Sequence, residues 1–253
     1  MARYFIELAY KGTNYHGWQR QPNGSSIQQD LEIALSTILQ IPISITGAGR
    51  TDAGVHAKYM VAHFNTSESI LNTNKLVYKL NRFLSKDIVV FFITKVSDDA
   101  HSRFDAIARG YEYHLTWHKN PFLQNLVTYI SFEPDVEIMN KAADKLMHYS
   151  DFTSFSKLHG NNKTNLCKVN YAKWEKRSDI LVFNIQADRF LRNMVRAIVG
   201  TILEVGSGKL SVTDFCEIIE AKDRGKAGTS VPADGLYLKD VIYPDDIFIS
   251  NKK

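Results

Sequence analysis

The sequence predicts an α+β protein made of two units, each of which interleaves strands and helices. Apolar residues alternate in some segments, as in strands, and recur every three or four residues in others, as in helices; both patterns occur in each half of the chain. The chain has 253 residues and is 44% hydrophobic, which suits one large core or two small ones. No Pro- or Ser-rich linker separates the halves, so we expect the sheets of residues 1–105 and 106–253 to abut or merge.

The first half begins with a strand and continues with a loop. Apolar side chains alternate along residues 3–10, and Gly, Asn and Pro recur in residues 11–24. A helix then begins at Ser25 or Ser26, each of which precedes a Gln by three residues as in a capping box, and Pro42 ends it. The other elements expected in this half are strands over 43–46, 58–65 and 88–96 and a helix over 76–84.

The second half repeats this order loosely. Strands are expected over 111–117, 169–174, 180–187 and 236–242, and helices over 139–147, from about 189 to 205, and after the capping pair Ser211 and Asp214. On the long helix, Arg189, Arg192 and Arg196 would lie on one side, either as a solvated basic stripe or as contacts to a substrate. The charge-rich segment 222–226 is most simply an exposed loop.

Charge and cysteine content narrow the class of protein. The 31 Lys and Arg against 27 Asp and Glu give a net charge of +4, which suits a protein that meets a polyanion on one face. The two cysteines, Cys167 and Cys216, predict no disulfide framework, so we expect a reducing, cytoplasmic compartment. The N-terminus lacks the apolar run of a signal peptide, and no stretch approaches the length of a membrane span.

A short loop is the strongest candidate for a functional site. Residues 47–57 lie between two apolar strands and combine three glycines with an Arg, a Thr, an Asp and a His. Asp52 could be a nucleophile or base and Arg50 a phosphate contact; alternatively, Asp52 caps a tight turn and Arg50 is solvated. The loop is not a P-loop, because no Lys-Ser or Lys-Thr follows the glycines, and its glycine spacing does not match a dinucleotide-binding loop.

The wider sequence resembles the tRNA pseudouridine synthase A family. The most specific stretch is GRTDAGVHA at 49–57. The supporting stretches, in the order expected of the family, are RFDA at 103–106 with RGYEY at 109–113, DFTSF at 151–155, FLRNMVR at 190–196 and GLYL at 235–238. The resemblance therefore covers nearly the whole chain.

This resemblance implies a fold and a reaction. The family fold has two pseudo-symmetric halves, each similar to a ferredoxin or RRM unit, joined in one mixed, mostly antiparallel sheet with flanking helices and a central basic cleft. The family isomerises uridine to pseudouridine at positions 38, 39 and 40 in the anticodon stem-loop of tRNA. It uses no cofactor and no metal, and it acts as a homodimer.

The resemblance also implies a role for particular residues. Asp52 is the catalytic carboxylate, Tyr111 stacks on the target base, and Arg196 pairs with Asp52. Tyr113 lies two residues further along the same strand face and is the alternative stacking residue. The carboxylate could attack C1′, add at C6 or assist a glycal route.

Further residues are candidates for substrate binding. By the resemblance, Leu236 and Tyr237 match a hydrophobic wall near the base. Arg50 could take the place of the flipped nucleotide or hold its phosphate, and Arg189 and Arg192 are candidate phosphate contacts. Gly110 stands where some relatives carry a second Arg, which leaves one fewer candidate phosphate contact.

Two other functions fit many of the same residues. An RNA-binding module without chemistry could use two RRM-like halves, and a pseudouridine synthase could have a different RNA specificity. Asp52 argues against the first, because a carboxylate in a phosphate-lined site harms binding. The histidines nearest to it in sequence, His16, His56 and His63, lack the paired spacing of a zinc site.

Overall fold

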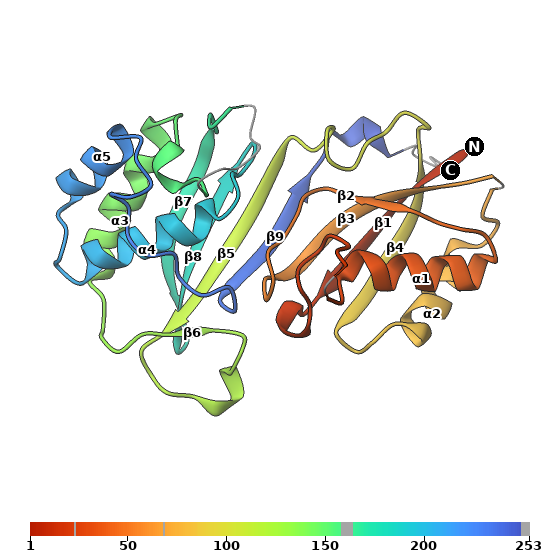
Figure 1. The fold of residues 1–253 in the computed structure, drawn as a ribbon, viewed down its shortest axis with the longest axis horizontal. Coiled ribbons are helices and arrows are strands. Elements are labelled where there is room, and N and C mark those ends of the chain that lie inside the picture. Colours follow the sequence, from red (N-terminus) through yellow and green to blue (C-terminus); the bar gives the residue numbers. More distant parts are fainter. Residues whose placement is uncertain (23, 68, 158–163, 249–253) are drawn as a thin grey trace. The chain divides into compact units, whose positions relative to one another are not determined.

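The computed structural model describes residues 1–22, 24–67, 69–157 and 164–248 (Figure 1). The chain divides into two compact units, Met1–Ile107 with Leu238–Lys253, and Ala108–Tyr237. This division differs at the C-terminal end from the predicted halves 1–105 and 106–253, because most of the last strand groups with the first unit. The backbone N–H of Ile107, for example, donates to the carbonyl of Ile242 at 2.8 Å.

The first unit follows the order β-α-β-β-α-β, which is that of a ferredoxin-like unit. Its elements are β1 (Ala2–Tyr10), α1 (Ile27–Leu39), β2 (Ile45–Gly47), β3 (His56–Thr66), α2 (Thr73–Phe83) and β4 (Ile88–Val96). β1 pairs antiparallel with both β3 and β4, and β2 pairs antiparallel with β3. Helices α1 and α2 lie side by side and pack on β2 and β4 (Figure 1).

Both faces of β1 are occupied, but by different parts of the chain. Tyr4, Ile6, Leu8 and Tyr10 are buried, as the alternation predicts. Phe5, on the opposite face, is also fully buried, because the C-terminal segment after the last strand covers it: the ring centroid of Tyr243 lies 5.3 Å from that of Phe5. The alternation therefore predicted the strand but not the second covered face.

Helix α1 begins where the capping pattern predicts. The Ser26 hydroxyl accepts from the backbone N–H of Gln29 at 3.3 Å, which satisfies one of the free donors of the first turn. The helix ends at Gln40, whose backbone is left-handed with φ 57°.

The second unit follows a similar order with two additional elements. Its elements are β5 (Ala108–Thr116), β6 (Thr128–Tyr129), α3 (Val136–Lys145), β7 (Val169–Arg177), β8 (Ile180–Ala187), α4 (Met194–Gly206) and α5 (Val212–Glu220), and β9 (Leu236–Ile242) begins at its end. The additional elements are β6 and α5, and only the start of β9 lies within the unit. β8 pairs antiparallel with β5 and β7, whereas β6 pairs parallel with β5. Short 3₁₀ helices cover Gly12–Asn14, Pro121–Leu123, Leu146–His148, Thr153–Phe155 and Asp245–Ile247.

All the strands of the described residues belong to one nine-stranded sheet. Its order is β4-β1-β3-β9-β5-β8-β7, with β2 on β3 and β6 on β5. The prediction of an α+β fold with one mixed, mostly antiparallel sheet is confirmed. Among the described residues, no helix is both long and apolar enough to cross a membrane.

The predicted helix from about 189 to 205 begins later than expected. α4 starts at Met194, because Asn193 has a left-handed backbone with φ 67° and the residues before it form a loop. The Asp188 carboxylate organises that loop by accepting from the backbone N–H groups of Lys168 and Arg189, at 2.8 and 2.7 Å. Arg189 and Arg192 therefore lie outside α4, and the predicted helical stripe with Arg196 is wrong.

Candidate active site

The loop that carries Asp52 connects β2 to β3 in the first unit. Its shape is fixed mainly by main-chain contacts with residues 12–18, the loop that follows β1. The backbone N–H of Trp18 donates to the carbonyl of Thr51 at 3.2 Å, and that of Gly54 donates to the carbonyl of Tyr15 at 3.3 Å. Within the loop, the N–H of Val55 donates to the carbonyl of Asp52 at 3.2 Å.

Two glycines allow these loops to come so close. A Cβ on Gly12 would clash with the carbonyl of Val55, and one on Gly17 would clash with that of Thr51. Gly17 also has φ +90°, a conformation that L side chains rarely adopt. Gly49, by contrast, has open space where a side chain would stand, so its neighbours do not require glycine.

Two side chains add to this attachment. The Thr51 hydroxyl lies 2.8 Å from the hydroxyl of Tyr10, and His56 Nδ1 accepts from the backbone N–H of Gly12 at 3.0 Å. His56 is buried and its contact is structural. Asp52 is half-buried and Arg50 is exposed, so the loop presents both at a fixed and accessible position.

In the second unit, the structure separates the two candidate stacking residues. Tyr111 is half-buried on β5 and makes an edge-to-face contact with Phe190, with ring centroids 5.0 Å apart. Tyr113 is fully buried. Its hydroxyl lies 2.6 Å from that of Thr128 and donates to the carbonyl of Pro232 at 2.9 Å, and burial raises its pKa. Only Tyr111 of the two has surface to offer to a base.

The loop before α4 contains the other two predicted arginines. Arg192 is exposed and Arg189 is half-buried. The Arg109 side chain donates to the carbonyl of Asp188 at 2.9 Å, which ties the loop to the start of β5. Together with the contact of Phe190, this places the loop next to Tyr111.

Arg196 is held by the segment that precedes β9. Its Nε donates to the carbonyl of Val231 at 2.7 Å, and the N–H of Val231 donates to the carbonyl of Arg196 at 3.2 Å. Gly200 allows the same segment to approach α4, since a Cβ there would clash with the carbonyl of Thr229.

Arg224 fixes the shape of that segment. Its guanidinium donates to the carbonyls of Ala227 and Gly228, at 3.1 and 3.2 Å, and to the hydroxyl of Ser230 at 2.9 Å. The Asn193 amide donates to the same hydroxyl at 2.6 Å. The prediction that 222–226 is simply an exposed loop is therefore wrong for Arg224, which is half-buried.

Leu236, the predicted hydrophobic wall, is buried at the start of β9. Its neighbour Tyr237 donates to the carbonyl of Leu126 at 2.6 Å and stacks on His114, with centroids 4.4 Å apart. Burial, followed by the charges of Asp234 and Glu112, raises the pKa of the Tyr237 hydroxyl. These contacts fix the strand that carries Leu236.

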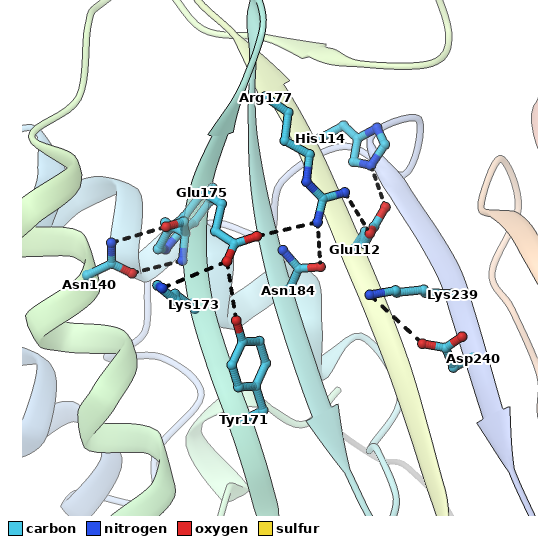
Figure 2. A network of polar contacts seen from close by, with 11 residues as sticks. Glu112, His114, Asn140, Tyr171, Lys173, Glu175, Arg177, Asn184, Lys239 and Asp240 are labelled. Atoms are coloured by element: carbon cyan, nitrogen blue, oxygen red, sulfur yellow. Dashed lines mark hydrogen bonds and ion pairs between the residues drawn. The ribbon is translucent and has the colours of Figure 1, made fainter.

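A second polar cluster includes Glu112 and His114, on the other face of β5 (Figure 2). Buried Glu112 accepts from Arg177 at 2.9 Å, and its other oxygen lies 2.9 Å from His114 Nε2. Arg177 also donates to Asn184 at 3.2 Å. Because neighbouring residues of a strand point to opposite faces, this cluster lies on the face away from Tyr111 and Tyr113. It explains how a carboxylate is buried in the sheet, and it is separate from the candidate site.

The histidines near Asp52 in sequence have different surroundings. His16 is exposed. His63 is buried, its Nδ1 accepts from the backbone N–H of Ser102 at 3.2 Å, and burial together with the charges of His101 and Arg3 lowers its pKa to about 4. Within the described ranges, no group of three or more His, Cys, Asp or Glu side chains could hold a metal ion.

The sequence does not indicate most of the contacts that position the candidate residues. The stretch 190–196 contains Phe190 but gives no sign of its contact with Tyr111, and the charges of 222–226 predict an exposed loop at Arg224. A half-buried Arg within a run of charges gives little sequence signal, because its acceptors are carbonyl groups. Asp52 and Arg50 belong to the first unit, whereas Tyr111, Arg189, Arg192, Arg196 and Leu236 belong to the second.

Comparison with known proteins gives a consistent result. A family model described as "tRNA pseudouridine synthase" matches residues 8–105 and 142–244. Three similar relatives, each named "tRNA pseudouridine synthase A", come from Parabacteroides distasonis, Bacteroides fragilis and Yersinia pseudotuberculosis. The first is 55% identical over 248 residues, which cover 98% of this chain and 98% of the relative. The second is 57% identical over 247 residues, which cover 97% and 98%. The third is 40% identical over 242 residues, which cover 95% and 91%. The chain therefore belongs to the tRNA pseudouridine synthase family, whose members are isomerases.

Proposed function

We propose that this chain converts uridine to pseudouridine in tRNA, at positions 38, 39 and 40 of the anticodon stem-loop, and that it acts as a homodimer. The family match and the relatives' names support tRNA as the substrate. The single observation that carries the site is the loop 49–57, in which main-chain contacts hold Asp52 half-buried and accessible. A homodimer would double the basic surface of a chain whose net charge is +4.

The reaction needs a group that can bond to an electrophilic carbon or take up a proton. It involves no change of oxidation state. The N1–C1′ bond breaks, the base turns, and C5 bonds to C1′; C5 loses its proton and N1 gains one. A carboxylate is suited to this work as a nucleophile or a base. We assign this role to Asp52.

Arg196 and Tyr111 complete the proposed site. A cation beside Asp52 would keep the carboxylate ionised and oriented. Arg196 suits this role because hydrogen bonds with Val231 already fix its position. The exposed part of Tyr111 would stack on the target base, which contributes about 1–3 kcal/mol and does not depend on base identity. Arg50, Arg189 and Arg192 would contact phosphates, and Leu236 would lie near the base.

The experiment is to map pseudouridine in tRNA from cells that lack the gene, after complementation with the wild type or with Asp52→Asn. We expect pseudouridine at positions 38–40 to be lost without the gene and restored only by the wild type. Loss at other tRNA positions would contradict the proposed target sites. Unchanged pseudouridine in the deletion strain, or full restoration by Asp52→Asn, would contradict the proposed function.

A further inference from the structure

Helix α2 has an unusual charge distribution. Thr73–Phe83 contains Lys75, Lys79 and Arg82 and no Asp or Glu. Of the α-helices in the described part of the chain, α1 and α5 carry carboxylates and no cation, and α3 and α4 carry both. The N-cap of α2 is the neutral Asn72, whose side chain accepts from the N–H of Lys75 at 2.8 Å. The helix therefore presents only positive charge.

The cations of α2 differ from three lysines of the second unit that are paired with carboxylates. Lys141, Lys173 and Lys222 lie 2.7, 3.8 and 3.0 Å from the carboxylates of Glu137, Glu175 and Asp151. Within residues 1–22, 24–67, 69–157 and 164–248, no carboxylate forms an ion pair with Lys75, Lys79 or Arg82. These charges are exposed and are not neutralised locally.

An aromatic side chain and a groove accompany the charges. Tyr78 is 62% exposed, and Arg82 donates to its hydroxyl at 3.1 Å while lying 5.8 Å from the ring centroid. Between α1 and α2 is an open groove of about 530 Å³, lined by Thr37, Ile38, Tyr78, Lys79, Arg82 and Phe83. Cations around an exposed ring suit a phosphate backbone with its sugars and bases.

The groove lies away from the Asp52 loop within the first unit. The N-terminal end of α1 is attached to residues 12–18, the loop that contacts the Asp52 loop: the N–H groups of Ile27 and Gln28 donate to the carbonyls of Gly17 and Trp18. The groove contacts the other end of α1, at Thr37 and Ile38. A helix rises 1.5 Å per residue, so these ends are about 15 Å apart.

We infer that the outer face of α2, formed by Lys75, Tyr78, Lys79 and Arg82, binds the sugar-phosphate backbone of tRNA at a distance from the target uridine. This inference rests on the proposed function for the identity of the RNA. The three cations span about 10 Å of helix, which is enough to contact consecutive phosphates of one strand. The contact would fix the tRNA body without reading its sequence, because phosphate contacts position a nucleic acid and do not specify its bases.

The test compares tRNA binding by two variants that lose the same charge. In Lys75→Gln/Lys79→Gln/Arg82→Gln, the Kd for tRNA should rise about tenfold near physiological salt. The negative slope of the logarithm of the association constant against log salt should become shallower by about 2 to 3. The matched control, Lys141→Gln/Lys173→Gln/Lys222→Gln, should change both much less. Lys75→Arg/Lys79→Arg keeps the charge and should bind as the wild type does.

Activity measurements separate this inference from the proposed function. At saturating tRNA, the α2 variant should form pseudouridine at the wild-type rate, because it loses binding and keeps the Asp52 site. If the wild type forms pseudouridine but the α2 variant and the control lose affinity equally, or neither loses any, the inference is wrong and the proposed function stands. If the wild type forms none, the proposed function is wrong, and the binding titration still decides the role of α2.

Discussion

The Asp52 loop and the Arg196 end of α4 are held in place in different ways. The loop is attached through main-chain hydrogen bonds and the close approach of Gly12 and Gly17. The Arg196 end of α4 shares one main-chain hydrogen bond with Val231, but the guanidinium itself is held by its own Nε, which donates to the carbonyl of Val231. The loop should therefore keep its shape when Asp52 is replaced but not when Gly12 or Gly17 is replaced. Replacing Arg196, in contrast, should disturb the Arg196 end of α4.

The largest effect on stability is expected from Gly17→Ala. The new methyl group would clash with the carbonyl of Thr51 at a positive φ, which should lower the free energy of unfolding by about 3 kcal/mol. Gly49→Ala is the matched control, with an expected change below about 0.5 kcal/mol because nothing lies near its Cβ position. Denaturant unfolding measures both. Equal stability of the two variants would contradict the main-chain attachment of the loop.

Arg196→Lys should have the next largest effect, and on turnover more than on folding. Lysine cannot reproduce the planar guanidinium or its Nε bond to Val231, so kcat should fall about ten- to a hundredfold. Single-turnover kinetics and a thermal melt measure the two effects separately. A large loss of stability with little loss of kcat would assign Arg196 a structural role instead.

His63 provides a side-chain contact at the base of the first region. Ser102 donates its N–H to His63 and its hydroxyl to the carbonyl of Thr46, which lies just before the Asp52 loop. The folded state lowers the pKa of His63 to about 4, below the unfolded value of about 6.5. Its contribution to stability is therefore complete above pH 6.5 and is lost as the pH falls toward 4.

We accordingly expect the free energy of unfolding to fall by about 1–2 kcal/mol more in the wild type than in His63→Asn between pH 7 and pH 4.5. Urea unfolding at the two pH values measures this difference. The same loss in both proteins would show that other groups cause the acid sensitivity.

The smallest effect is expected from Arg224→Ala, which acts on Arg196 through segment 227–231. Loss of the hydrogen bonds to Ala227, Gly228 and Ser230 should lower kcat about three- to tenfold with little change in KM. Arg224→Lys should restore part of the activity. If KM rises and kcat does not change, the segment serves RNA binding and does not position Arg196.

Helices and strands could be predicted from the sequence where the hydrophobic pattern stops at the residue that ends the element. The bounds of β4, β8 and β9 coincide with the predicted 88–96, 180–187 and 236–242, because alternation or an apolar run ends there at polar or turn residues. The start of α4 could not be predicted, since apolar spacing continues through Leu191 and hides the left-handed turn at Asn193. Local periodicity carries no signal for one residue with a positive φ.

The sequence motif of the candidate site could be predicted, but the contacts that shape the site could not. The stretch 49–57 identifies Asp52, yet nothing in it indicates that Gly12 and Gly17, more than thirty residues earlier, shape the loop. The choice between Tyr111 and Tyr113 required burial, because both lie on the same strand face. Long-range packing and main-chain acceptors are the parts that a single sequence does not reveal.

The most direct test of the account is tritium release from tRNA labelled at C5 of uridine. C5 must lose its hydrogen when it bonds to C1′, so the wild type should release tritium while Asp52→Asn, although folded and able to bind tRNA, should release it at least about a thousandfold more slowly. Tritium release by Asp52→Asn at the wild-type rate would contradict the central role of this carboxylate.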